Sequence, residues 1–163
     1  MHPELPVGGV ALADLFRGRG IDLGAAHARL KRLMDAEGLP FEPRERTYGT
    51  RLAQELGKWG ERQGKPEIHD ALYRAVFVEG AAVDRPETLV RVAEGVGLDP
   101  VEAARILEAQ SLSDEVDADW KRARELGVTG VPTFVAGGEA VVGAQPYELL
   151  EELVRAAGAQ PRR

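Results

Sequence analysis

The sequence predicts an α+β fold that is predominantly helical, with one β-hairpin near its C-terminal end. Between residues 12 and 127, apolar side chains recur at intervals of three and four, which is the period of an α-helix. After Gly127 the pattern changes to two short apolar runs separated by Gly137 and Gly138, which is typical of a hairpin. With 163 residues and 44% hydrophobic residues, the chain is large enough for one domain with a real core.

The N-terminal half is expected to form four helices. The first two span residues 12–17 and 23–37, and Gly38 ends the second. The third spans residues 50–63, and the fourth begins near Pro66. The second helix is expected to bury an apolar stripe made of Ala26, Leu30, Leu33 and Met34. The third helix is expected to bury a stripe made of Leu52, Leu56 and Trp59.

Two further helices carry clear start signals. Asp84 stands three residues before Glu87, and Asp99 stands three residues before Glu102, so each aspartate is predicted to cap a helix. A seventh helix is expected to start within residues 111–117 and to end at Gly127. Its acidic run, residues 114–119, favours a first helical turn over a metal site, because acids suit the helix dipole and the spacing fails the calcium-loop pattern.

The C-terminal segment supplies the strands. Residues 131–136 and 139–142 are predicted to pair through the Gly137–Gly138 turn. Pro146 then opens a terminal helix. Its inward face is expected to consist of Leu149, Leu150, Leu153 and Val154.

Composition excludes several kinds of chemistry. The formal charge of −6 argues against a nucleic-acid partner, which would require a basic face. The sequence has no run of about 18 apolar residues, which a membrane span requires, and its first residues lack a secretory signal. A cytoplasmic location is therefore expected. The three histidines lack metal-ligand spacing, and no phosphate-binding or dinucleotide motif occurs. The sequence therefore predicts no metal site and no cofactor.

Several segments resemble one known family. The strongest are GVTGVPTF at residues 127–134 and GAQP at 143–146, and upstream segments follow in the same order. Together they resemble DsbA-like thioredoxin proteins, specifically the FrnE-type branch named dithiol–disulfide isomerase. The upstream matches are HPELP at 2–6, GLPF at 38–41, residues 47–59, ALYRAVFVEG at 71–80 and GLD at 97–99.

The resemblance implies a thioredoxin-like fold with a large helical insertion. Residues 1–127 would form the helical insertion domain with an N-terminal linker, and residues 128–163 the closing half of the thioredoxin-like domain. The Val131–Pro132 bond is expected to be cis, and Gly130, Val131 and Pro132 to form a substrate-binding turn. A polypeptide would pair there by strand addition. Glutathione is the alternative, because 2-hydroxychromene-2-carboxylate isomerases of the same superfamily also carry Val-Pro at this site.

The chain departs from the family in the residues that carry its chemistry. Family members place Cys-x-x-Cys in an N-terminal βαβ unit, whereas this chain contains no cysteine and its first residues already match the stretch after that unit. We expect no disulfide exchange from this polypeptide and no catalytic residue in it. Three interpretations remain open: a shortened family member, a fragment of a longer product, or a helical module that binds a partner. The strand at residues 133–136 would present an unpaired edge, which predicts a homodimer.

Overall fold

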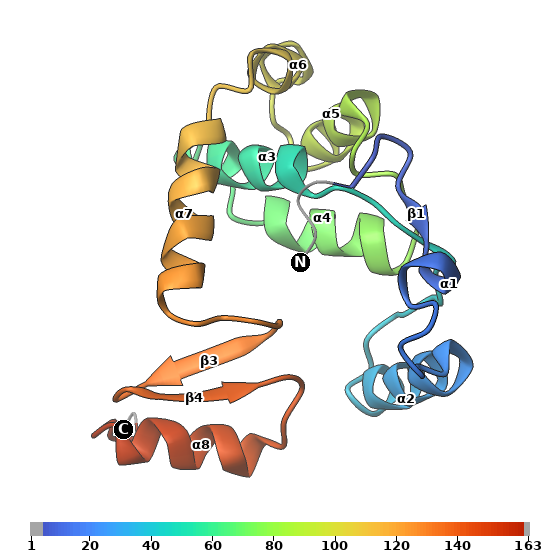
Figure 1. Cartoon of the computed structure of the whole chain (residues 1–163). Helices are drawn as coiled ribbons and strands as arrows, with labels where there is room; N and C mark the ends of the chain where they lie inside the picture. The colour runs from blue at the N-terminus through green and yellow to red at the C-terminus, as the bar shows by residue number, and fades with distance from the viewer. Residues whose placement is uncertain (1–4, 162–163) are drawn as a thin grey trace. The chain divides into compact units, whose positions relative to one another are not determined.

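The computed structural model describes residues 5–161 and divides the chain into two compact units (Figure 1). The helical unit extends to Asp117, and the hairpin unit begins at Ala118, so the division falls inside one helix. The fold is mainly helical α+β, as the sequence predicts. A domain boundary at residue 127 stays a prediction. Within residues 5–161, no helix is long and apolar enough to cross a membrane.

The helical unit contains most of the secondary structure. Its elements in chain order are β1 (Val10–Ala11), α1 (Leu12–Leu15), α2 (Leu23–Ala36), β2 (Arg46–Thr47), α3 (Arg51–Arg62), α4 (Ile68–Phe77), α5 (Pro86–Gly95), α6 (Pro100–Ala109) and the first part of α7 (Ser113–Glu125). The helices predicted from sequence all form, with ends within about two residues of those expected.

The core of the helical unit lies among α3, α4, α5 and α6. Leu56, Ile68 and Leu89 are fully buried there, and Trp59 of α3 packs in the same cluster. This confirms the apolar stripe predicted for residues 50–63. Gly60 allows α3 and α4 to approach closely, because a Cβ at Gly60 would lie 2.6 Å from the Ile68 Cγ2.

Helix α2 differs from its prediction in burial. It forms where expected, and the Asp22 side chain accepts a hydrogen bond from the Ala25 N–H at its start. None of its residues is buried, however, and Leu30 and Leu33 are 43% and 44% exposed. Helical spacing identifies which face of a helix is apolar, but it does not establish that another element covers that face.

The pair β1–β2 was not predicted. Val10 pairs with Thr47 and Ala11 with Arg46 in an antiparallel ladder. Two residues per strand are too few to show the alternation by which strands are identified. Gly9 is required beside this pair, because its φ is +64° and a Cβ would lie 2.2 Å from the Thr47 carbonyl oxygen.

One of the two predicted caps is confirmed and the other is wrong. Asp99 caps α6 by accepting hydrogen bonds from the N–H groups of Val101 and Glu102. At α5 the N-cap is Arg85, because Pro86 takes the first helical position. Asp84 instead accepts a 2.7 Å hydrogen bond from the Gly8 N–H, a contact between segments 76 residues apart.

The hairpin unit contains the end of α7, the strands β3 (Thr133–Ala136) and β4 (Glu139–Val142), and α8 (Tyr147–Ala156). Positive φ angles at Gly137 and Gly138 form the two-residue turn expected between the strands. Figure 1 shows α8 alongside the hairpin, and a Cβ at Gly137 would lie 3.0 Å from the Ala157 Cβ.

The inward face predicted for the terminal helix is only partly buried. Leu153 is 9% exposed and Leu150 is half-buried, but Leu149 and Val154 are 40% and 43% exposed. A two-stranded sheet is too narrow to cover a whole helix face. The expectation that all four residues face inward is therefore wrong for Leu149 and Val154.

Candidate functional site

The three residues predicted to bind substrate lie at the entrance to β3. The Val131–Pro132 peptide bond is cis, which confirms the expectation drawn from sequence. Val131 is 58% exposed, Pro132 is exposed and Gly130 is half-buried. The structure therefore brings these residues together in one accessible turn. Their role as a substrate site stays a prediction.

Two hydrogen bonds hold this turn to the hairpin. The Thr133 hydroxyl donates to the Gly130 carbonyl oxygen at 2.7 Å, and the Gly143 N–H donates to the Pro132 carbonyl oxygen at 2.8 Å. Gly130 also leaves little space for a side chain, since a Cβ there would lie 3.3 Å from the Val142 Cγ1. The turn is thus fixed by neighbours on both sides.

The strand pairing determines which backbone groups of β3 remain open. In an antiparallel pair, alternate residues direct their N–H and C=O groups to the partner strand. The Pro132 carbonyl accepts a hydrogen bond from the Gly143 N–H, and the register pairs Phe134 with Val141. The backbone N–H and C=O groups of the even-numbered residues in this strand therefore face β4. Among residues 5–161, β3 pairs with β4 alone. The backbone groups of Thr133 and Val135 therefore form an open edge.

Val131 extends this open edge into the turn. Its backbone N–H and C=O have no hydrogen-bond partner among the residues that the structure describes. Sequence reasoning identified Val131 and expected an unpaired edge at residues 133–136, but it did not indicate that Thr133 and Val135 are the residues facing outward, because this depends on strand register. The open edge is defined here as Val131, Thr133 and Val135.

The segment that carries the open edge has exposed apolar side chains and no charged residue. Phe134, Val135 and Val142 are each at least 40% exposed. Residues 128–137 include no ionisable side chain, so this segment offers no general acid or base. What it offers chemically is backbone hydrogen bonding beside exposed apolar side chains.

The titratable groups with shifted pKa values lie in the helical unit. Burial raises the pKa of the Glu55 carboxyl and lowers the pKa of the Arg44 guanidinium. The hydrogen bond between Glu102 and Arg105 lowers the pKa of the former and raises that of the latter. These groups belong to α3, the segment before β2, and α6.

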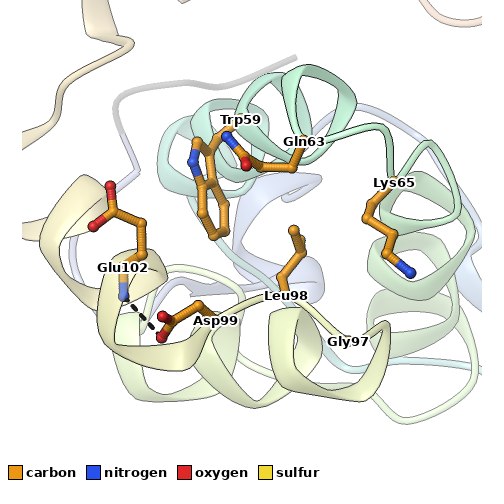
Figure 2. A pocket seen from close by; sticks show the side chains of 7 residues that line it. All are labelled: Trp59, Gln63, Lys65, Gly97, Leu98, Asp99 and Glu102. Atoms are coloured by element: carbon orange, nitrogen blue, oxygen red, sulfur yellow. Dashed lines mark hydrogen bonds between the residues drawn. The ribbon is translucent and has the colours of Figure 1, made fainter.

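A hollow of about 410 Å³ lies between α3 and the start of α6 (Figure 2). Trp59 and Leu98 line it, with Lys65 on one side and Asp99 and Glu102 on the other. Both acids already interact within α6, since Asp99 caps the helix and Glu102 forms an ion pair with Arg105. We assign no chemistry to this hollow.

The acidic run that starts α7 is engaged in ion pairs. Asp117 lies 2.7 Å from an Arg51 guanidinium nitrogen, and Glu115 pairs with Arg62. Within residues 5–161, no cluster of three histidine, cysteine or acidic side chains is placed to hold a metal ion. The run thus joins α7 to α3.

Comparison with known proteins identifies the family. The model of the DSBA-like thioredoxin domain matches residues 2–155, which is nearly the whole chain. The chain therefore belongs to the DSBA-like thioredoxin domain family. It is a member without cysteine. The sequence match at residues 2–4 lies outside the described residues.

Individual relatives agree with this assignment. The chain is 33% identical to a probable DsbA oxidoreductase from Streptomyces coelicolor, with a TM-score of 0.79, covering 99% of this chain and 74% of that one. A 2-hydroxychromene-2-carboxylate isomerase structure is 27% identical, with a TM-score of 0.66, over 83% and 66% of the two chains. YwbO of Bacillus subtilis, an uncharacterized protein, is 29% identical over 89 residues, 54% of this chain. That match spans 44% of the length of YwbO.

Proposed function

We propose that the open edge binds an extended polypeptide by strand addition, as the substrate-holding part of a DsbA-type oxidoreductase or isomerase. The observation that carries this proposal is the run of outward backbone groups at Val131, Thr133 and Val135. Unpaired strand edges are templates for an added strand. The likeness to the Streptomyces coelicolor oxidoreductase supports it.

The proposed contribution of this chain is binding, without thiol chemistry of its own. Disulfide exchange needs a thiolate nucleophile, and none of the 163 residues is a cysteine. The redox thiols would have to come from outside these residues. This polypeptide is accordingly expected to give no turnover in an insulin-reduction assay.

The test uses the backbone N–H of Val135, which faces the open edge. In V135P this donor is lost while the bonds to β4, made by the neighbouring residues, remain. The matched control V135A keeps the N–H and removes only side-chain contacts. The ¹⁵N-labelled chain would be titrated with a blocked, cysteine-free octapeptide of alternating valine and threonine, and the amide shifts of residues 131–135 followed by NMR.

The proposal predicts saturable shifts along residues 131–135 in the unsubstituted chain and in V135A. V135P should bind at least tenfold more weakly, since a net hydrogen bond of about 1 kcal/mol is lost and the proline ring adds a clash. Equal binding by V135P and V135A, or shifts confined to other residues, would count against strand addition.

Glutathione is a second candidate for the same turn. The likeness to a 2-hydroxychromene-2-carboxylate isomerase, at 27% identity, favours it. Titration with glutathione in place of the octapeptide distinguishes the two candidates. Shifts at residues 130–132 with glutathione, and none with the octapeptide, would favour the isomerase-type function.

A second copy of this chain can occupy the same edge. Two copies of β3 pairing across a two-fold axis would satisfy the outward groups of both strands. Sedimentation should then show a dimer at micromolar concentration that V135P dissociates and V135A preserves. A monomer under these conditions would exclude this pairing and leave the edge open to a peptide.

A further inference from the structure

A separate cavity of about 270 Å³ lies in the helical unit between α4 and α5. Small residues leave this space between the helices, and at Gly95 an added Cβ would meet nothing within 4 Å. Its lining includes Arg74 of α4, Glu79 after it, and Thr88, Arg91 and Gly95 of α5.

The lining of this cavity carries a net positive charge. Arg74 and Arg91 contribute two guanidinium groups, and Glu79 contributes one carboxylate. Glu79 lies 3.6 Å from Arg74, so these two charges offset one another. Arg91 has no ion pair with any described residue. Its charge and its hydrogen-bond donors are therefore available to a ligand.

Thr88 supplies a hydroxyl group to the same cavity. Thr88 as a residue is only 8% exposed, and it lines the cavity beside Arg91. A threonine hydroxyl both donates and accepts hydrogen bonds, so it can bind an oxygen of an anion. Thr88 and Arg91 are about one helical turn apart on α5, so both side chains can donate hydrogen bonds to the same group of a ligand.

We propose that this cavity binds a small organic anion, a carboxylate or phosphate group on a short apolar body. Guanidinium and hydroxyl donors match the oxygens of such a group. Val92 and Val96 provide apolar wall for the body of the ligand. A volume of about 270 Å³ lies just below the usual range of drug-sized pockets, so the ligand has an anionic group and a few carbon atoms.

The experiment compares three probes by NMR on the ¹⁵N-labelled chain. Isobutyrate and inorganic phosphate represent the two anion types, and isobutylamine represents a cation of similar shape. The proposal predicts saturable shifts at the amides of Thr88, Arg91 and Gly95 with at least one anion and none with the amine. The tighter of the two anions identifies the ligand as carboxylate or phosphate.

Variants assign the binding to this cavity. R91Q removes the unpaired charge and should weaken anion binding about tenfold or more, whereas R32Q, an exposed arginine on α2, should leave it unchanged. T88V removes the hydroxyl, and G95L fills the space without changing any charge. Binding by the amine, or anion binding that survives both R91Q and G95L, would overturn the proposal.

Discussion

The buried carboxylate of Glu55 accepts a hydrogen bond from the backbone N–H of Leu112, 57 residues away in the sequence. The two atoms are 3.2 Å apart, and Glu55 is fully buried within α3. Its second oxygen, Oε1, has no hydrogen-bond partner among the described residues. This contact fixes the start of α7 to α3, but it places a carboxyl group in surroundings that disfavour its charge.

Stability should depend on pH through Glu55. Burial raises its pKa, against smaller opposing effects of the Leu112 N–H and Arg51. Between the unfolded pKa, near 4.5, and the raised folded pKa, the folded state binds more protons, so this group's contribution to stability falls as pH increases. Urea denaturation from pH 4 to pH 8 should show E55Q gaining stability relative to the unsubstituted chain as pH rises.

The slope with pH, rather than the stability at one pH, is the diagnostic quantity. Glutamine also changes the hydrogen bonding at Leu112, which shifts the stability by an amount that does not vary with pH. A difference between E55Q and the unsubstituted chain that stays constant from pH 4 to pH 8 would contradict this role for Glu55.

Two glycines of the helical unit should respond oppositely to alanine. At Gly60 the new methyl group would overlap the fully buried Ile68, which costs about 1–3 kcal/mol and outweighs the gain in helix propensity of about 1 kcal/mol. At Gly95 the methyl enters open space, so G95A should stabilise by up to about 1 kcal/mol. Urea midpoints measure both, and stabilisation by G60A would contradict the close approach of α3 and α4.

Removing the aspartate caps of α6 and α2 should lower the global stability by different amounts. Asp99 caps α6, which contributes buried residues to the core, so D99A should lower global stability by about 1 kcal/mol. Asp22 caps α2, which has no buried residue, so D22A should fray α2 with a smaller global effect. Amide exchange resolves the two cases, and equal global losses would contradict the looser packing of α2.

Much of the fold could be predicted from the sequence, because its signals are local. Helical spacing predicted α3 correctly, and Gly137–Gly138 predicted the hairpin turn. What failed depended on tertiary contacts: Asp84 meets Gly8 rather than capping a helix, and nothing in the sequence indicated that Leu30 would stay exposed. Local pattern does not specify the partner of a polar or apolar group.

The candidate site shows the same limit. The turn at Val131 and Pro132 could be located through the family resemblance, whereas the outward direction of Thr133 and Val135 required the register of β3 against β4. The α4–α5 cavity carries no motif at all. Thr88 and Arg91 have ordinary helical spacing on α5, and only the packing of α4 against α5 brings Arg74 to the same cavity.

The stability of the hairpin unit should depend on Leu153. This residue is the one buried side chain of α8, whereas its neighbour Val154 is 43% exposed. L153A should loosen α8 from the hairpin at a cost of about 2–5 kcal/mol, while V154A should cost less than about 1 kcal/mol. Amide exchange at residues 133–142 measures the effect directly. Because a two-stranded hairpin has only marginal stability alone, L153A should also speed the exchange of the amides that pair β3 with β4. Unchanged protection of these amides would show that β3 and β4 are held by contacts other than those with α8.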